Sequence, residues 1–398
     1  MPDADDERPL RIVHVIGGLE LGGAETLLYR LATHRIPGIE QEVICLGKRD
    51  WYSSRLEEHG ITVRHLGMSS PLTALTGIRQ LGGLLSSSGA DIIQSWMYFA
   101  NVLSAIARRN GTPVVWGIHN SSFERVGLPS RLCAYAGGAN ARRLTNFVVN
   151  CSQHSAEMHA KLGYSAVAGT VIPNGYDASA FRPHAKARAL TRRMLGLDDN
   201  RFVVGSIARW HSHKDIPNLL KAVRLAADKG VPLRCFLIGR GLDTANHELS
   251  AAIRATRCDE LVTLLGARGD VPDLARALDL HVLSSSSEAF PNVVAETMLS
   301  GTPNAVTDVG DSAFMVGDTG WVVPAGDSAA LAQAVVQAWG ERSGAAREWG
   351  KRRRRARERI VQNFTFEKMA DAYARVWRDL AGQSLQQKQR RGHAENRA

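Results

Sequence analysis

The stretch SSSSEAFPNVVAETMLSGTP, residues 284–303, carries two glutamates, Glu288 and Glu296. The preceding residues, DLHVLSSSS, read as a buried strand that ends in a loop. Pro291 suits the first turn of a helix, and the apolar residues after it continue at helical spacing. The alternative is a purely structural one: an amphipathic helix with one glutamate near its cap and one exposed. However, backbone N–H groups at a helix start attract anions. Two carboxylates beside such an end would suit a ligand that carries both phosphates and hydroxyl groups, as a nucleotide sugar does.

Length and composition are those of a globular protein with two domains of ordinary size. The chain has 398 residues, of which 44% are hydrophobic, and this length is long for a single core. No apolar run approaches the roughly 20 residues of a membrane-spanning helix, and the acidic start does not resemble a secretory signal. Five scattered cysteines without a CxxC pair predict a reducing, cytoplasmic location, with neither a disulfide framework nor a zinc site.

The net charge of +10 suits either nucleic acid or the anionic inner face of a membrane as a partner. Much of this charge lies in KRRRRARER, residues 351–359, where a solvated helix face is the alternative. No RNA- or DNA-binding motif accompanies the run. We therefore expect no nucleic-acid partner.

Short apolar strands alternate with helical stretches, and the alternation restarts halfway along the chain. The expected strands are 11–16, 42–47, 62–67, 91–96, 113–119 and 147–152, and then 201–209, 233–239, 261–266, 280–285 and 303–308. Such a pattern predicts an α/β fold with two doubly wound parallel sheets. The carboxyl ends of both sheets are then expected to face a central cleft.

The same patterns predict the domain boundaries. An amino-terminal domain is expected at 1–180, a basic linker at 181–200 and a carboxyl-terminal domain at 201–362. A helix follows at 363–382, and the polar tail at 383–398 is expected to be disordered.

Polar residues gather where the expected strands end. Arg209 ends the strand that opens the second half, and Lys214 lies in the loop that follows. Two cations there could neutralise a diphosphate leaving group, although a pair of surface cations is the alternative. His119 follows the fifth strand, where a structural histidine is the alternative.

Three glycine-containing turns also follow strands, and each has a plain strand-to-helix turn as its alternative. The turn at 17–25 (GGLELGGAE) lacks the G-x-G-x-x-G spacing of dinucleotide-binding folds. The other two turns are GRGLD at 239–243 and GARGDVPDL at 266–274. Glycine in such turns lets the backbone approach a ligand closely.

Taken in order, the Ser-Glu, Phe-Pro-Asn, Glu and Gly-Thr-Pro of residues 287–303 resemble the donor-binding signature of family 4 glycosyltransferases, which are retaining enzymes of the GT-B fold. The resemblance runs from Gly17 to about Trp377. It implies that the helix at 363–382 crosses back to the amino-terminal domain. This chain departs from the family pattern at Asp215 and Ala289, where relatives often have glycine, and at Asn304, where the strand is usually apolar.

The resemblance also implies roles for single residues. Arg209 and Lys214 would bind the donor phosphates in place of a metal ion, His119 would lie by the donor sugar, Glu288 would contact a hydroxyl of the transferred sugar, and Glu296 would bind the ribose. The remaining donor-binding positions would be Gly22, Gly23, Gly239, Gly241, Arg268, Phe290, Pro291, Asn292 and Val293.

The function implied by the resemblance is retaining transfer of a hexosyl unit from a UDP- or GDP-linked sugar, without a cofactor or metal. The implied acceptor is a lipid-linked oligosaccharide of lipopolysaccharide, capsule or exopolysaccharide synthesis at the cytoplasmic face of the membrane. Arg131, Arg142 and Arg143 border an apolar helix and predict peripheral association with anionic lipid. Two alternatives stay open: a GT-B sugar-nucleotide epimerase, and a basic nucleic-acid-binding protein with a degenerate catalytic domain.

Overall fold

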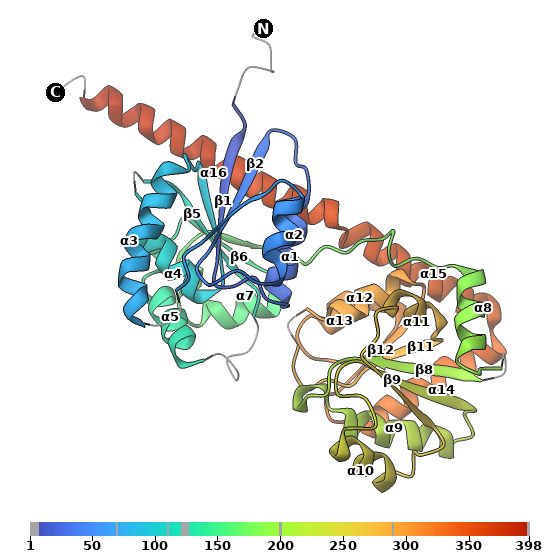
Figure 1. Ribbon diagram of the computed structural model, residues 1–398. Coiled ribbons are helices and arrows are strands. Elements are labelled where there is room, and N and C mark those ends of the chain that lie inside the picture. Colours follow the sequence, from blue (N-terminus) through green and yellow to red (C-terminus); the bar gives the residue numbers. More distant parts are fainter. Residues whose placement is uncertain are drawn as a thin grey trace. The chain divides into compact units, whose positions relative to one another are not determined.

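The computed structural model describes residues 8–68, 71–109, 111–120, 127–198, 201–288 and 290–395 (Figure 1). The chain divides into two compact units. Met1–Gly175 and Glu367–Ala398 form the first unit, and Tyr176–Phe366 form the second. Each unit has its own parallel sheet and its own hydrophobic core, so the α/β class predicted from the sequence is confirmed.

The first unit is built on a seven-stranded parallel sheet in the order β3-β2-β1-β4-β5-β6-β7. Its strands are β1 (Leu10–Ile16), β2 (Ile39–Cys45), β3 (Thr62–His65), β4 (Ile92–Trp96), β5 (Val114–Ile118), β6 (Phe147–Asn150) and β7 (Gly169–Val171). Its helices are α1 (Gly23–Thr33), α2 (Trp51–Glu58), α3 (Pro71–Ser87), α4 (Tyr98–Ala107), α5 (Leu128–Ala139), α6 (Ala141–Leu144), α7 (Gln153–Ala160) and most of α16 (Phe366–Glu395), with a short 3-10 turn η1 (Tyr164–Ala166). Helices α1 and α2 lie on one side of the sheet, and α3, α4 and α5 lie on the other (Figure 1).

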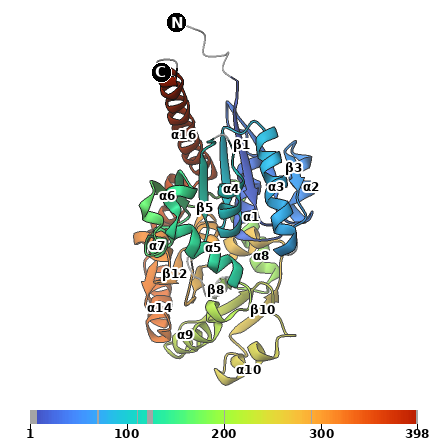
Figure 2. The ribbon, with the colours of Figure 1, turned by 90° about the vertical axis from the view of Figure 1, so that its left-hand side faces the viewer.

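The last helix, α16, runs along the first unit (Figures 1 and 2). Trp377 Nε1 donates a 3.0 Å hydrogen bond to Gln94 Oε1 on β4. The Arg378 guanidinium donates to the carbonyl of Pro37 at 2.9 Å. Both aromatic residues that α16 turns toward the sheet, Tyr373 and Trp377, are fully buried. This helix therefore completes the core of a unit whose strands all lie before Gly175.

The second unit has a six-stranded parallel sheet in the order β10-β9-β8-β11-β12-β13. Its strands are β8 (Phe202–Ile207), β9 (Leu233–Ile238), β10 (Val262–Gly266), β11 (Leu280–Leu283), β12 (Asn304–Thr307) and β13 (Trp321–Val323). Its helices are α8 (Ala185–Met194), α9 (Ile216–Asp228), α10 (His247–Ala255), α11 (Val271–Ala277), α12 (Asn292–Leu299), α13 (Ser312–Val316), α14 (Ser328–Gly344) and α15 (Ala346–Asn363), with 3-10 turns η2 (Ser212–Lys214) and η3 (Gly317–Thr319).

In both sheets the strand order reverses beside the first strand. β1 lies between β2 and β4, and β8 lies between β9 and β11. In an open parallel sheet, ligands bind outside the carboxyl ends of the strands at such a reversal. The loops that follow β8 and β11 are therefore the first place to look for a site in the second unit.

Several boundaries differ from those expected. Residues 181–200 are not a free linker: α8 belongs to the second unit, because Arg188 and Arg192 both bind Asp279. The tail expected to be disordered is helical, since α16 continues to Glu395. The strands β7 and β13 were not expected, because each has only three residues and a segment that short shows no periodicity.

The basic run at 351–359 lies on α15, and most of its arginines bind groups within the second unit. Their partners are Glu341 for Arg352, the Gly301 carbonyl for Arg353, Asp318 for Arg355, the Leu299 carbonyl for Arg357 and the Met315 carbonyl for Arg359. These contacts differ from the solvated helix face considered above.

No helix in the described part of the chain is both long enough and apolar enough to cross a membrane.

Candidate functional site

The loops after β8 and β11 bring Lys214 and Glu288 together, as the strand reversal predicts. Lys214 Nζ forms an ion pair with Glu288 Oε1, and Ser285 Oγ donates to the same oxygen at 2.6 Å. The side chains of Lys214 and Glu288 are 22% and 12% exposed. Both side chains are partly buried but still reachable from solvent. A ligand can therefore replace Glu288 as the partner of Lys214, or Lys214 as the partner of Glu288.

The two loops are also joined through their backbones. Ser284 Oγ donates to the carbonyl of Lys214 at 2.7 Å, and the Ser286 amide donates to the carbonyl of His213 at 2.8 Å. These bonds fix the position of Lys214 relative to Glu288 without using either charged group. The two loops are therefore held together by contacts other than the Lys214–Glu288 ion pair.

Asp215, which stands where relatives often have glycine, adopts a left-handed conformation with φ 43° and ψ 50°. Glycine reaches this region without strain, and aspartate is among the few other residues that tolerate it. The Asp215 carboxylate also caps α9 by accepting from the Asn218 amide at 3.3 Å. The chain therefore keeps the turn that a glycine would give and gains a helix cap.

Arg209 follows β8 and is exposed. Its side chain forms no hydrogen bond or ion pair with any residue that the structure describes. On either side of it, the Ala208 amide donates to the Ile238 carbonyl and the Trp210 amide to the Arg240 carbonyl, both at 2.8 Å. The backbone of this cation is thus held in place while its guanidinium group stays available to an anion.

The loop after β9 passes close to the loop after β8, and this approach requires glycine at positions 239 and 241. Gly239 has φ 138°, and a Cβ on it would lie 1.8 Å from the Ala208 carbonyl oxygen. Gly241 has φ 74°, and a Cβ there would lie 2.9 Å from the Trp210 Cβ. Both glycines thus shape the end of the strand that carries Arg209.

Arg268 lies in the loop after β10 and pairs with Asp270 through two hydrogen bonds of 2.8 and 2.7 Å. The Arg268 guanidinium therefore stabilises its own loop by binding a carboxylate two residues away.

Pro291 is the N-cap of α12, and the helix itself begins at Asn292, one residue later than expected. Phe290 is buried and stacks on Tyr176 with ring centroids 6.4 Å apart. The Tyr176 hydroxyl donates to Asn292 Oδ1 at 2.8 Å. Phe290 therefore anchors the start of α12 in the core. Val293 and Glu296, on the first turns of the helix, are half-buried, and Ala289 lies outside the described residues.

The unexpected Asn304 belongs to a buried polar cluster. Its Oδ1 accepts from His281 Nδ1 at 2.6 Å and from Thr297 Oγ1 at 3.1 Å. The Ile207 amide donates to the other ring nitrogen of His281 at 3.4 Å. Burial lowers the pKa of His281 to about 4, so this histidine is neutral. The cluster links α12 to the strands that carry the site loops.

In the first unit, Gly22 and Gly23 lie at the start of α1. Gly22 is extended, and a Cβ on it would meet the Glu25 carboxylate, with Oε2 only 2.1 Å away. No atom lies within 4 Å of a Cβ built on Gly23. Burial raises the pKa of Glu25. This helix start is therefore open at Gly23 and has a carboxylate beside it at Gly22.

His119 follows β5 and is half-buried. Its ring stacks on Trp96 with centroids 5.1 Å apart, and its Nε2 lies 3.5 Å from the Tyr373 hydroxyl of α16. Desolvation lowers the pKa of His119 to about 4. The ring is therefore neutral at pH 7 and can offer a hydrogen bond but no charge.

Three contacts of the site were not anticipated from the sequence. Ser285 lies three residues before Glu288 in a run of serines, and that spacing is the one signal that could have identified it. Tyr176 and Tyr373 contact site residues far from them in sequence, and nothing local marks them. The structure places the cation–carboxylate pair in the second unit and Gly22, Gly23 and His119 in the first.

Within the described residues, no group of three or more His, Cys, Asp or Glu side chains is arranged to hold a metal ion.

Two family models match the chain. The model described as Glycosyltransferase Family 4 matches residues 21–180, and the model described as Glycosyl transferases group 1 matches residues 201–341. The group 1 match lies within the second structural unit, and the family 4 match covers most of the first unit and ends five residues beyond Gly175. The family 4 match includes Gly22, Gly23 and His119. The group 1 match includes the loops that carry Arg209, Lys214 and Glu288.

The individual relatives share about a quarter of their residues with this chain. The chain is 26% identical over 330 residues to the putative glycosyltransferase EpsF of Bacillus subtilis, covering 75% of this chain and 79% of that protein. It is 25% identical over 244 residues to an Escherichia coli UDP-Gal:alpha-D-GlcNAc-diphosphoundecaprenol alpha-1,3-galactosyltransferase, covering 58% and 62%. Among solved structures, Anabaena Alr3699/HepE in complex with UDP has a similar fold, with a TM-score of 0.81 at 23% identity, covering 93% and 100%.

Proposed function

Because the chain belongs to the family 4 glycosyltransferases of the GT-B fold, we propose that it transfers a hexosyl unit from a UDP- or GDP-linked sugar, with retention of anomeric configuration. The proposed acceptor is a lipid-linked oligosaccharide in the synthesis of a bacterial surface polysaccharide. The E. coli relative is named for a UDP-linked donor and a diphosphoundecaprenol-linked acceptor, and it supports this choice of substrate classes.

The observation that carries the proposal is the pairing of Lys214 with Glu288 across the loops after β8 and β11, with the exposed Arg209 in the same loop as Lys214. A diphosphate at this strand end would take Lys214 from Glu288 and would gain Arg209 as a second cation. Both cations then stabilise the negative charge that develops on the leaving group. Glu288, released from Lys214, would accept a hydrogen bond from a hydroxyl group of the transferred sugar.

Helix α12 supports binding of the nucleotide. Its N-cap, Pro291, offers no side-chain acceptor to the first amide groups, and amides at a helix start favour an anion. Glu296 lies one turn further along, where its carboxylate would accept hydrogen bonds from the ribose hydroxyls. Phe290, buried under this helix start, keeps it in place.

Retention requires no protein nucleophile in this proposal. As the bond between the anomeric carbon and the diphosphate oxygen breaks, the acceptor hydroxyl attacks the same face of the sugar. A diphosphate oxygen takes the proton of that hydroxyl. The protein then contributes mainly positioning and charge stabilisation. In the first unit, neutral His119 can offer a hydrogen bond but no charge, and the helix start at Gly23 can offer an unobstructed backbone amide. Arg209 and Lys214 would replace a metal ion.

An exposed apolar face in the first unit supports a lipid-linked acceptor. Leu128, Leu132 and Tyr135 of α5 are 69%, 60% and 49% exposed, and their spacing puts them on one side of the helix. Exposed Arg131 lies on the same helix, and Arg142 and Arg143 lie on α6, which follows. Leucines inserted at a membrane surface and arginines at anionic headgroups would hold the enzyme where its acceptor is anchored.

The test is a transfer assay with the purified chain, a panel of UDP- and GDP-sugars and a polyprenyl-diphosphate-linked saccharide, with and without EDTA. We expect one donor to give an extended lipid-linked product with the anomeric configuration of the donor, and EDTA to leave the rate unchanged. A donor sugar altered in the absence of acceptor would instead support the epimerase. Activity that EDTA abolishes and manganese restores would contradict the role given to the two cations.

A further inference from the structure

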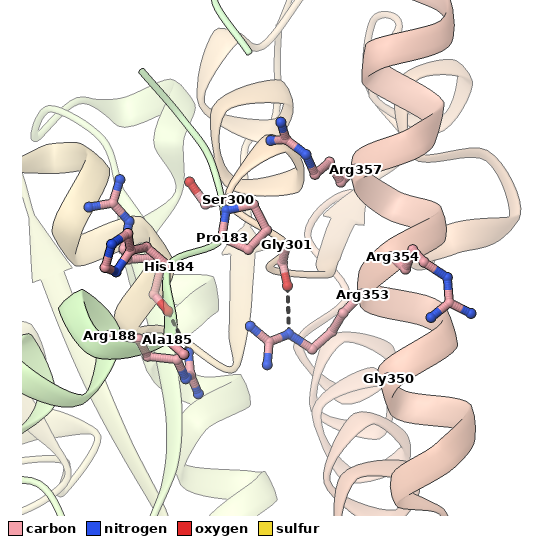
Figure 3. Close-up of a pocket in the computed structure, with 11 residues that line it drawn as sticks. Pro183, His184, Ala185, Arg188, Ser300, Gly301, Gly350, Arg353, Arg354 and Arg357 are labelled. Atoms are coloured by element: carbon pink, nitrogen blue, oxygen red, sulfur yellow. Dashed lines mark hydrogen bonds between the residues drawn. The ribbon is translucent and has the colours of Figure 1, made fainter. Parts of the chain in front are cut away.

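The second unit contains a cavity that is separate from the loops after β8 and β11. Its volume is about 380 Å³, and its walls come from the segment before α8, from α8 itself, from the end of α12 and from α15 (Figure 3). Its charged lining residues are Arg188, Arg276, Arg353, Arg354 and Arg357. None of Arg209, Lys214 or Glu288 contributes to it.

Arg353 has the hydrogen-bonding capacity that a ligand would use. Its Nε donates to the Gly301 carbonyl at 2.7 Å, and its guanidinium points toward the start of α8, where His184 and Ala185 lie (Figure 3). Its two terminal amino groups form no hydrogen bond with any described residue. An arginine fixed through Nε in this way presents two parallel N–H groups, the geometry that carboxylates and phosphates match.

A second unmatched donor belongs to Arg276. Its Nε is buried and has no hydrogen-bond partner within the described chain. A buried donor without a partner is costly, and this nitrogen is out of reach of solvent, so Arg276 contributes positive charge to the cavity wall. His184 adds a third group: its Nδ1 accepts from the Ala187 amide at 3.1 Å, so its Nε2 carries the proton and can donate.

Two of the five arginines that line the cavity, Arg353 and Arg357, have no carboxylate partner among the described residues, whereas Arg354 pairs with Glu358. The cavity lining includes no carboxylate. The nearby Asp279 is already shared by Arg188, Arg192 and Arg342, and Asp273 is engaged by Arg276. Burial lowers the pKa of Arg188 to about 10 and also lowers the pKa of Arg353, which means that these cations are held at an energetic cost. A bound dianion would offset that cost.

We propose that this cavity is a binding site for a phosphate group, either inorganic phosphate or the phosphomonoester of a small molecule. A phosphate dianion provides acceptors for both free amino groups of Arg353 and for Nε2 of His184. The volume lies near the lower end of the range for small-molecule pockets, roughly 300–1,000 Å³, and leaves room for a small organic group. The site adjoins Ser300 and Gly301, at the opposite end of α12 from Asn292.

The first experiment is calorimetric titration of the full chain with inorganic phosphate and, separately, with glycerol 3-phosphate, against sodium chloride at equal ionic strength. We expect both phosphates to bind and to raise the melting temperature by mass action. Arg353→Gln should weaken binding about tenfold or more, because a charge-assisted pair of hydrogen bonds is lost. Arg347→Gln is the matched control: Arg347 is exposed at the start of α15, and this change should leave binding intact.

Ala185→Glu provides a test that does not depend on removing a buried arginine. Ala185 is exposed at the first position of α8 and lines the cavity, so a glutamate there places a carboxylate among the arginines. We expect the variant to melt at a higher temperature without phosphate and to lose its response to phosphate. Lys186→Glu, which adds an acidic group to the same helix turn outside the cavity, controls for the effect of the helix dipole.

Three results would overturn the proposal. The unsubstituted chain could fail to bind either phosphate in the titration. Ala185→Glu could respond to phosphate as the unsubstituted chain does, a result that decides the matter even if Arg353→Gln does not fold. Finally, Arg209→Gln could remove the phosphate response, which would place the bound phosphate at the loop after β8.

Discussion

Ser285 Oγ donates a hydrogen bond to Glu288 Oε1, the same carboxylate oxygen that Lys214 contacts. Ser285 is fully buried, so this bond holds Glu288 from the protein side whether or not Lys214 stays paired. When a donor phosphate takes Lys214, the serine remains as the contact that orients the carboxylate.

Ser285→Ala should therefore reduce turnover and leave nucleoside diphosphate binding almost unchanged. Loss of one hydrogen bond to a carboxylate costs about 1.5 kcal/mol, which corresponds to a rate lowered by about tenfold. Steady-state transfer rates and calorimetry with the free diphosphate measure the two effects. Ser286→Ala, an exposed neighbour with a 3.5 Å contact, is the control. Equal losses of turnover and of diphosphate affinity would contradict a positioning role.

The two glutamates should separate in the same measurements. Glu296→Ala should weaken both the nucleoside diphosphate and the nucleotide sugar, by about 1–3 kcal/mol, because ribose hydroxyls would lose their acceptor. Glu288→Ala should lower turnover strongly, since its contact is with the transferred sugar. It should not weaken the free diphosphate, because it releases Lys214. If Glu288→Ala lost diphosphate affinity as severely as Glu296→Ala, the roles assigned here would be wrong.

Gly239→Ala should destabilise the second unit by several kcal/mol. A methyl group there would overlap the Ala208 carbonyl oxygen, and the φ of 138° is a conformation that only glycine adopts readily. Gly269→Ala is the control, because a Cβ at that position meets nothing within 4 Å; the change should alter the free energy of unfolding by less than about 0.5 kcal/mol. Urea denaturation of both variants measures the free energy of unfolding. Similar denaturation midpoints for the two would contradict the predicted strain at Gly239.

Stability should fall as the pH drops from 6.5 toward 4. His14 and His281 are fully buried, and burial lowers the pKa of each to about 4. The unfolded chain binds protons on these histidines near pH 6.5, whereas the folded chain does not until about pH 4. Each histidine therefore contributes a slope of about 1.4 kcal/mol per pH unit across that window. Urea denaturation between pH 7.5 and 5 measures it, and His14→Gln should reduce the slope. A flat profile would show that these rings are protonated inside the fold.

The exposed face of α5 should bind anionic vesicles. Leu132→Ser removes an apolar contact worth about 1.5–3 kcal/mol when buried, and Arg131→Gln removes about 1 kcal/mol of attraction to anionic lipid. Both should reduce flotation with anionic liposomes, and the arginine effect should shrink at high salt. Leu225→Ser, at an exposed leucine of the second unit, should have no effect. If flotation depended neither on lipid charge nor on any of the three substitutions, α5 would not be the membrane-binding surface.

The sequence predicts the sheets well and the contacts of the site less well. Buried strands of parallel sheets are continuous apolar runs, so 201–209 and 280–285 were found, and with them the loops that carry Arg209 and Glu288. The short strands β7 and β13 have too few residues for such a signal. That Arg353 and Arg357 of the basic run contact carbonyl groups could not be read locally, because Gly301 and Leu299 lie some fifty residues before the arginines that contact them.

The position of α16 has a consequence for synthesis of the chain on the ribosome. The strands of the first unit are complete by Val171, yet Tyr373 and Trp377, which cover Trp96 and Gln94, are translated after the whole of the second unit. While residues 176–366 emerge and fold, the earlier unit lacks the helix that closes its core. The buried amide of Gln94 and the ring of Trp96 stay open to solvent for that interval. The nascent first unit therefore exposes surface that the finished protein buries, and a stop codon before α16 would deprive it of that helix permanently.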